Sequence, residues 1–297
     1  MNKEELMTAF SERSRMVEDY IEGAVDKEDN DIKTVTDSMR YSLLSGGKRI
    51  RPFLALEFCR LFGGGDEAAL PFAAAIEFIH TFSLIHDDLP CMDDDEMRRG
   101  KPTNHIVYGE ATALLAGDAL ALHAFGMITE NEKASEYARL NAVSVLSRAS
   151  ADMGMVGGQI IDMYGEENKL TFETLLKLHS LKTGALIRAS AMLGCLAAGV
   201  PQNDKRMASA ITYSENIGLA FQIIDDILDR EGDEELLGKP IGSDGENGKT
   251  TFLSFMSVDE ARKYALDLTD RAKKAIEEYP GSEMLISLAD YLLYRNY

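Results

Sequence analysis

The chain has 297 residues, of which 45% are hydrophobic and 27% are charged, with 50 acidic side chains against 31 basic ones. The net charge of −19 argues against a nucleic-acid-binding protein, since contacts with phosphates need a basic surface. An anionic ligand would therefore need clustered bases or bridging cations. Because no linker-like stretch divides the chain, we expect a single domain over residues 1–297.

The N-terminal segment and the cysteines favour a cytoplasmic protein without a transmembrane segment. Residues 1–20 alternate charges and lack the apolar core of a signal peptide. The apolar stretches 111–128 and 185–200 contain Asp118 and Arg188, so neither offers the uncharged run of a membrane span. The three cysteines are widely spaced and form no CxxC pair, as expected of reduced thiols.

Helical patterns dominate the chain. Residues 69–85 (ALPFAAAIEFIHTFSLI) are apolar nearly all round, which predicts a helix buried in the middle of the protein, and residues 211–228 predict a second one. Ser257-Val-Asp-Glu260 has the form of a capping box at the start of a charged amphipathic helix. We expect breaks at 63–66, 165–169, 201–204 and 232–248. No alternating strand pattern exceeds a few residues, so we predict an all-α protein.

The first acidic cluster follows the predicted buried helix. The stretch HDDLPCMDDDEMRRG, residues 86–100, holds Asp87, Asp88 and Asp93 in the spacing DDxxxxD. Crowding of like charges beside an apolar helix is unfavourable unless a cation completes the group. The following run, Asp94-Asp95-Glu96, is consistent with solvated charge, and we give it no catalytic role.

The second acidic cluster, Asp225-Asp226-Ile-Leu-Asp229, ends another apolar helix. On a helix, Asp225 and Asp229 are i,i+4 neighbours with Cβ atoms about 5–6 Å apart, and Asp226 is i,i+3 from Asp229. A lone DDxxD is most often a solvated helix end. Two such triads, each at the end of an apolar helix, favour carboxylates that hold Mg²⁺ ions and grip a polyanion in one cavity.

Basic residues suited to anionic ligands surround these clusters. They are Lys48, Arg49 and Arg51 beside Gly46-Gly47; Arg98, Arg99 and Lys101; Lys182; and Lys239 and Lys249, which bracket a Gly-rich stretch suited to a closing lid. Each group alone is weak support. Together they indicate two phosphate-bearing ligands, one held on metal ions and one on bare cations.

These motifs resemble those of the trans-prenyl (polyprenyl) diphosphate synthases, in particular the bacterial farnesyl diphosphate synthase type. The resemblance rests on GGKRIRP, DDLPCMD followed by RRGKPT, GEATALLAGDAL, KTGALI and FQIIDDILD, with GKTT and YRNY extending it over the whole chain. It implies an isoprenoid-synthase-type helical bundle around a deep central cavity, and a homodimer. The implied reaction condenses isopentenyl diphosphate head to tail with dimethylallyl and then geranyl diphosphate, giving farnesyl diphosphate and diphosphate.

The resemblance also implies a role for each motif residue. As metal ligands or their immediate partners it implies Asp87, Asp88, Asp93, Asp225, Asp226 and Asp229, around three Mg²⁺ ions for which Mn²⁺ can substitute. Contacts to the allylic substrate or its leaving diphosphate fall to Arg98, Lys182, Gln222, Lys239 and Lys249, while Thr183 and Gln222 offer oxygen dipoles to the carbocation. The pocket for isopentenyl diphosphate is assigned to Lys48, Arg51, His80 and Arg99.

Product length is predicted from the residues just before the first acidic motif. In the family, bulky side chains there form the floor of the chain pocket. Phe82 lies five positions before Asp87, about one and a half helical turns deeper at about 1.5 Å per residue, with Ser83 beside it. An aromatic residue there predicts a fifteen-carbon product, with geranylgeranyl or geranyl diphosphate as alternatives.

Other interpretations explain less of the sequence. A terpene cyclase or squalene-type synthase has no need of a second diphosphate pocket, and a non-catalytic subunit of a heteromeric synthase typically loses one aspartate motif. A helical scaffold with acidic patches leaves the basic clusters unexplained. Arg295 fits a residue that closes the site and an ordinary surface arginine equally well. His86 adjoins the first motif as a neighbour of the ligands, and His179 receives no role.

Overall fold

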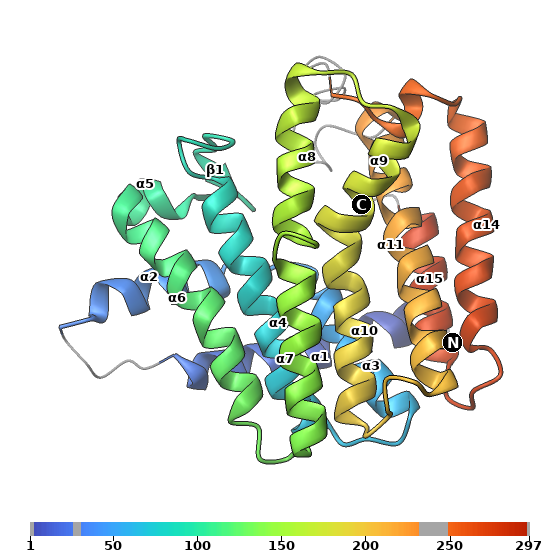
Figure 1. Ribbon diagram of the computed structural model, residues 1–297, viewed down its shortest axis with the longest axis horizontal. Coiled ribbons are helices and arrows are strands. Elements are labelled where there is room, and N and C mark those ends of the chain that lie inside the picture. The colour runs from blue at the N-terminus through green and yellow to red at the C-terminus, as the bar shows by residue number, and fades with distance from the viewer. Residues whose placement is uncertain (1–2, 26–30, 232–248, 296–297) are drawn as a thin grey trace.

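The computed structural model describes residues 3–25, 31–231 and 249–295, and within these ranges it is almost entirely helical (Figure 1). The predicted all-α class is therefore confirmed. The only strands in the described part of the chain are β1 (Met97–Arg98) and β2 (Lys101–Pro102), which form a small antiparallel hairpin. Lys239 and nearly all of the Gly-rich stretch predicted as a lid lie outside the described residues.

The described helices follow one another with short connections. They are α1 (Lys3–Ala24), α2 (Lys33–Leu43), α3 (Ile50–Leu61), α4 (Asp66–Asp87), α5 (Asn104–Tyr108), α6 (Glu110–Thr129), α7 (Glu136–Ser150), α8 (Met155–Glu167), α9 (Phe172–His179), α10 (Ala185–Ala197), α11 (Lys205–Glu231), α14 (Val258–Ile276) and α15 (Glu283–Tyr294). A five-residue π-helix, η1 (Ser180–Gly184), joins α9 to α10, and a 3₁₀ turn, η2 (Phe252–Ser254), precedes α14.

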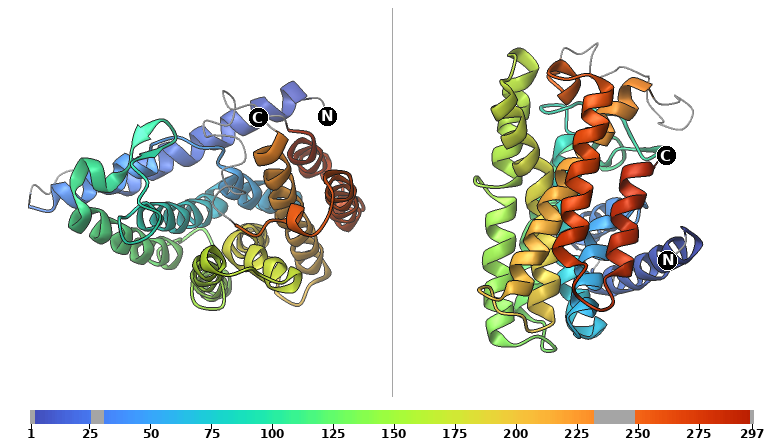
Figure 2. Two further views of the ribbon diagram at one scale, coloured as in Figure 1. Left: turned by 90° about the horizontal axis from the view of Figure 1, so that it is seen from above. Right: turned by 90° about the vertical axis from the view of Figure 1, so that its right-hand side faces the viewer.

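Helix α4 is the centre of the bundle, as its composition predicts. It packs against α1, α3, α6 and α10, and its phenylalanines Phe72 and Phe78 are fully buried. The turned views show α14 and α15 covering one side of the bundle and α6 lying on the opposite side (Figure 2). The C-terminal end of α4, where Asp87 is the last helical residue, therefore faces a space between α6, α8 and η1.

Two of the described helices, α4 and α6, are long and apolar enough to cross a membrane by length and composition alone. For α4, 67% of the apolar window is buried inside the bundle, as expected of a core helix. For α6 only 39% is buried. Its leucines Leu115 and Leu122 are 59% and 74% exposed, and α7 adds Leu140 at 73% and α8 adds Ile160 at 63%. These three helices thus carry a shared apolar face, on the near side in Figure 1.

Local sequence signals set the ends of several helices. The break predicted at 63–66 separates α3 from α4, and the one at 201–204 separates α10 from α11. The capping box is present at the start of α14: Ser257 Oγ accepts from the backbone N–H of Glu260, while Glu260 Oε2 accepts from the backbone N–H of Ser257 at 2.8 Å. The break predicted at 232–248 lies outside the described residues.

Candidate active site

An apolar cavity of about 540 Å³ opens beside the end of α4. Its polar residues gather near the first acidic motif and η1, and the rest of its lining is mostly aliphatic, aromatic or thioether. It is lined by Arg51, His80, Phe82, Ser83, Leu84, His86, Asp87, Leu89, Cys91, Met92, Leu114, Met155, Val156, Gln159, Ile160, Met163, Lys182 and Thr183. This is the geometry expected of a site that binds a charged group at one end and a hydrocarbon chain at the other.

The π-helix η1 shapes the charged end of this cavity. The sequence predicted a helix start or kink at Lys182-Thr183-Gly184, and the chain instead widens to a π-helix between α9 and α10. Helix α8 approaches it so closely that a Cβ on Gly158 would lie 2.3 Å from the backbone nitrogen of Lys182. Such π-turns are frequent at functional sites, and this one places Lys182 and Thr183 on the walls of two cavities at once.

The second of these cavities is polar and has a volume of about 190 Å³. Its described lining includes Asp225, Asp226, Gln222 and Lys249, so the second acidic motif and three residues predicted to contact the allylic substrate, counting Lys182, meet here. Thr183 Oγ1 donates to Gln222 Oε1 at 3.0 Å, and Gln222 Nε2 donates to Asp225 Oδ2 at 3.1 Å. A hydrogen-bonded chain thus connects the predicted catalytic pair to a predicted metal ligand.

Two acidic residues of this cavity region were missed by the sequence analysis. Lys182 Nζ forms an ion pair with Asp162, and Lys249 Nζ forms one with Glu166 at 3.3 Å. Asp162 and Glu166 are one helical turn apart on α8. Their i,i+4 spacing on one face of a predicted helix was the available signal, but neither belongs to an aspartate-rich motif.

The first acidic motif divides between two environments. Asp87 lines the apolar cavity, and desolvation raises its pKa against the opposing effect of Lys182. Desolvation also raises the pKa of Asp93, opposed by Lys182 and Lys249. These two carboxylates therefore lie within electrostatic reach of the same lysine, in surroundings that favour a nearby cation.

Asp88 and Arg98 point elsewhere. Asp88 is only 3% exposed, and Arg98 Nε donates to its Oδ1 at 2.6 Å. Burial raises the pKa of Asp88 to about 6 although Arg98 opposes the shift. Both residues line a separate small cavity of about 30 Å³ and neither lines the two cavities that share Lys182. The structure thus does not bring Arg98 to the residues predicted to hold the allylic diphosphate.

The residues Asp94, Asp95 and Glu96 form the loop that leads into the hairpin. Asp94 has a left-handed backbone, φ 54°, and its N–H donates to the carbonyl of Leu89. The backbone carbonyls of Asp95 and Glu96 accept hydrogen bonds from the side chain and the N–H of Thr103. All three side chains are exposed, which agrees with solvated charge.

The second acidic motif is held by the C-terminal end of the described chain. Arg295 is 6% exposed, its guanidinium lies 3.8 Å from the centre of the Phe221 ring, and its Nη2 forms an ion pair with Asp225. Asp226 Oδ2 accepts from the N–H of Phe252 at 2.7 Å, and Asp229 is buried and lines neither cavity. Of the two interpretations of Arg295, the structure supports the residue that closes the site.

A metal ion would fit the chemistry of this donor set but would have to enter it by exchange. Among the residues that the structure describes, no three His, Cys, Asp or Glu side chains lie close enough together to hold a metal ion. Oxygen donors such as Asp87, Asp93 and Asp225 are the ligands that Mg²⁺ prefers. Asp225 is paired with Arg295, so an ion bound there would displace an arginine.

A third cavity, of about 440 Å³, brings together all four residues predicted to bind isopentenyl diphosphate. Lys48, Arg51, His80 and Arg99 line it, and burial lowers the pKa of each. For His80 the neighbouring arginines act in the same direction, so the imidazole stays neutral. The buried Nε of Arg51 has no hydrogen-bond partner among the described residues, which is the state expected of a donor that awaits an anion.

Glycine and a buried glutamate hold this basic pocket together. Arg99 has φ 53° at the turn of the hairpin, and its guanidinium donates to the carbonyl of Gly46. A Cβ on Gly47 would lie 2.7 Å from Arg99 Cζ, so only glycine allows this approach. Glu77, an acidic residue inside the apolar helix α4, forms an ion pair with the buried Arg49 and also lines the cavity. The sequence analysis assigned no role to Glu77.

Comparisons with known proteins agree with this arrangement. The polyprenyl synthetase family matches residues 32–281. A geranylgeranyl diphosphate synthase of Cyanophora paradoxa is 46% identical over 98% of this chain and 97% of its own, and a farnesyl diphosphate synthase of Bacillus subtilis is 42% identical over 98% and 99%. The crystal structure of a geranylgeranyl pyrophosphate synthetase from Pyrococcus horikoshii superposes with a TM-score of 0.89 at 32% identity, covering 98% of this chain and 99% of that one.

Proposed function

The chain belongs to the polyprenyl synthetase family and is a trans-prenyl diphosphate synthase, and from this premise we propose that its product is farnesyl diphosphate. The substrates would be isopentenyl diphosphate and, in turn, dimethylallyl and geranyl diphosphate. The observation that carries the proposal is the place of Phe82, which lines the apolar cavity below Asp87. Five helical residues separate them, about 7.5 Å of depth at about 1.5 Å per residue.

The three cavities divide the work of a condensation. The basic cavity of Lys48, Arg51, His80 and Arg99 would hold the diphosphate of isopentenyl diphosphate, since its donors face an otherwise uncompensated pocket. The polar cavity with Lys182 and Lys249 would hold the allylic diphosphate, and the apolar cavity would take its hydrocarbon chain. Arg51 and His80 line both the basic and the apolar cavity, so the two substrates would meet there.

The reaction breaks the carbon–oxygen bond of the allylic diphosphate and leaves an allylic carbocation. Lys182 and Lys249 stabilise the charge that develops on the departing diphosphate. The oxygens of Thr183 and Gln222 present their dipoles to the cation, and the apolar walls keep water from quenching it. The double bond of isopentenyl diphosphate then forms the new carbon–carbon bond, and a proton leaves the adjacent carbon to the released diphosphate.

Magnesium dependence is part of the proposal. Asp87 and Asp93 from one motif and Asp225 from the other would hold the ions, with Asp88, Asp226 and Asp229 as ligands or as their partners. Bound Mg²⁺ would neutralise the diphosphate and make it a better leaving group. Because Lys182 pairs with Asp162 and Arg295 with Asp225, ion and substrate would have to take over these carboxylates and bases together.

The oligomer and the cellular location are proposed on the same basis. A second copy of this chain would cover the apolar face of α6, α7 and α8, because exposed leucines at this density are uncommon on a monomer. A cytoplasmic location would suit a chain that works on water-soluble diphosphates. Relatives named for farnesyl and for geranylgeranyl products are about equally similar, so geranylgeranyl diphosphate stays the alternative product. A non-catalytic subunit is less favoured because both aspartate motifs are complete.

The test is a product analysis by mass spectrometry with dimethylallyl and isopentenyl diphosphates. We expect the purified chain to make the fifteen-carbon diphosphate with Mg²⁺ and nothing with excess EDTA. Phe82→Ala removes the floor and should raise the ratio of twenty- to fifteen-carbon product at least tenfold. Phe62→Ala, which truncates a partly buried ring that lines none of the three cavities, should leave the ratio unchanged.

The outcomes separate the parts of the proposal. No condensation by the unmodified chain would contradict the enzyme itself. A twenty-carbon product from the unmodified chain would overturn the farnesyl assignment alone. An unchanged ratio in Phe82→Ala would show that Phe82 is not the floor.

A further inference from the structure

Phe82 does not stand alone at the floor of the apolar cavity. The imidazole of His86, four residues later on α4, meets its ring edge to face, with the ring centroids 5.0 Å apart and the planes at 84°. Helical side chains lean toward the N-terminus of their helix, so the ring of His86 reaches back over Phe82. Both side chains line the same cavity.

His86 is in turn fixed to helix α6. Its Nε2 lies 3.0 Å from the backbone carbonyl oxygen of Leu114. A carbonyl oxygen can only accept, so in the neutral ring this hydrogen bond places the proton on Nε2. The two rings and the α6 backbone thus form one continuous contact from the cavity floor to the neighbouring helix.

Gly117 makes this contact possible. A Cβ at position 117 would lie 2.1 Å from His86 Nε2 and 2.4 Å from its Cδ2, far inside contact distance. Only a hydrogen at this position leaves room for the imidazole between α4 and α6. The backbone of Gly117 has no positive φ, so the glycine serves the approach of His86 and not a special turn.

We propose that His86 is a specificity-determining residue for product length, which holds Phe82 in place and is itself seated in the notch at Gly117. This rests on the proposed function, in which the growing chain fills the apolar cavity. A chain one isoprene unit too long must push Phe82 aside, and the side toward α6 is already filled by the imidazole. Close-packed rings yield only if a neighbour leaves or is compressed.

Three variants test the proposal through changes of opposite sign. His86→Ala empties the space beside Phe82 and should raise the ratio of twenty- to fifteen-carbon product at least fivefold. Gly117→Ala forces the imidazole off Leu114 toward the cavity, and should instead raise the ratio of ten- to fifteen-carbon product at least fivefold. The double variant should behave like His86→Ala, since loss of the imidazole leaves room for the methyl group added at position 117.

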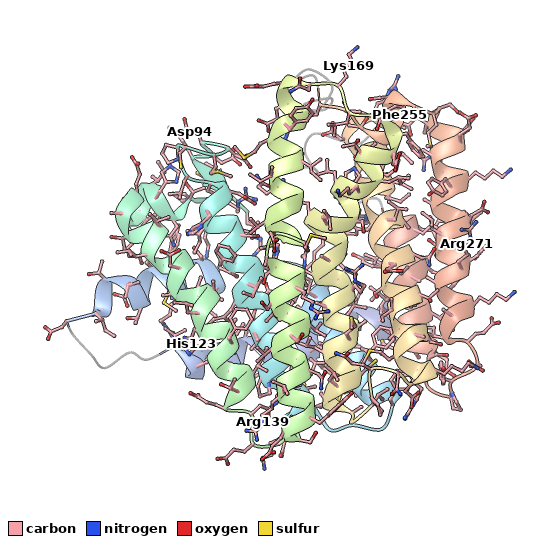
Figure 3. All side chains as sticks on the ribbon, in the orientation of Figure 1. Asp94, His123, Arg139, Lys169, Phe255 and Arg271 are labelled. Carbon is pink, nitrogen blue, oxygen red and sulfur yellow. The ribbon has the colours of Figure 1, made fainter. Side chains whose placement is uncertain are left out.

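Matched controls lie on the same helix. His123 on α6 meets Phe78 edge to face at 5.3 Å, in an arrangement like that of His86, but lines none of the cavities described above. It lies low on α6, away from the motif loop marked by Asp94 (Figure 3). A Cβ on Gly126 would meet nothing within 4 Å. His123→Ala and Gly126→Ala should leave the product ratios unchanged.

A double-mutant cycle separates a brace from a second wall. If His86 acts through Phe82, the His86→Ala change should have no further effect in a Phe82→Ala background. Independent, multiplying effects would overturn the proposal, as would unchanged products in either His86→Ala or Gly117→Ala. If His86→Ala proves inactive, Gly117→Ala alone decides. The ratios are read against the unmodified chain, so a twenty-carbon parent would contradict the farnesyl assignment without touching this comparison.

Discussion

At the scale of single residues, His179 is a base that the fold keeps neutral. Its imidazole stacks on Phe252 with ring centroids 5.1 Å apart, and burial lowers its pKa to about 4. The unfolded chain would bind a proton near the ordinary value of 6.5. Between these two values the unfolded state holds more protons than the folded one, so folding stability falls as the pH falls from about 6.5 toward 4.

The His179→Phe variant isolates this contribution because it keeps an aromatic ring against Phe252 and removes the titration. We expect the unmodified chain to lose up to about 3 kcal/mol of unfolding free energy relative to the variant between pH 6.5 and 4. Urea denaturation at several pH values measures the difference. Equal pH dependence of the two proteins would show that His179 does not titrate in this window.

At the same scale, the sequence identified residue types better than their partners. Lys48, Arg51, His80 and Arg99 line one cavity as predicted, because they belong to motifs with fixed spacing. The pairing of Arg98 with Asp88 was not predictable, since it depends on which way two adjacent side chains point at the end of α4. Asp162 escaped notice because its partner Lys182 is twenty residues away on another helix.

At the scale of elements, the π-helix η1 depends on its neighbours. It carries Lys182 and Thr183, and α8 touches its backbone at Gly158. A Cβ at 158 would lie 2.6 Å from Lys182 Cα, where no flexible side chain can yield. We therefore expect Gly158→Ala to shift η1 and to cost about 1–3 kcal/mol of stability, as overpacking commonly does.

The kinetic consequence of Gly158→Ala should exceed the structural one. A displaced Lys182 loses its place beside the allylic diphosphate, so kcat/KM should fall at least tenfold at a temperature where the variant is still folded. Steady-state kinetics and thermal melts of Gly158→Ala measure the two effects, with Gly23→Ala as the control because a Cβ there meets nothing within 4 Å. Full activity would mean that η1 tolerates the shift.

The sequence predicted helix ends more successfully than this irregular turn. Ser257 and Glu260 lie within one helical turn, so their capping box is a local signal and is present as expected. A π-turn is set by what packs against it, here the close approach of Gly158 and the contact between Gly184 and Gly218. Nothing within KTG itself distinguishes a π-turn from a kink.

At the scale of the whole molecule, the apolar face of α6, α7 and α8 is also the outer wall of the apolar cavity. Leu114, Val156, Ile160 and Met163 line the cavity and are each at least 40% exposed in the single chain. A second copy over this face would separate the growing hydrocarbon from water. The proposed dimer and the proposed chemistry are therefore linked through one surface.

The linked prediction uses charge on that surface. Leu122→Glu combined with Leu140→Glu should convert a particle of twice the 32.8 kDa chain mass into a monomer, because two carboxylates would have to be buried per chain. Light scattering after gel filtration measures the mass, and condensation should fall at least tenfold. Leu266→Glu on α14, at a side chain 40% exposed, is the control and should change neither. A monomeric parent, or a dimeric double variant, would rule out this interface.

The sharing of residues between the cavities has a consequence for inhibitor discovery. Lys182 and Thr183 belong to two cavities, and Arg51 and His80 to another pair, so the three spaces adjoin at two junctions. Small fragments that each occupy one space can be screened separately and then joined by short linkers across these junctions. Linking makes the second and third contacts intramolecular, with effective concentrations on the order of millimolar for short flexible linkers. Weak fragments for a greasy, an acidic and a basic compartment would thereby combine into one tight ligand.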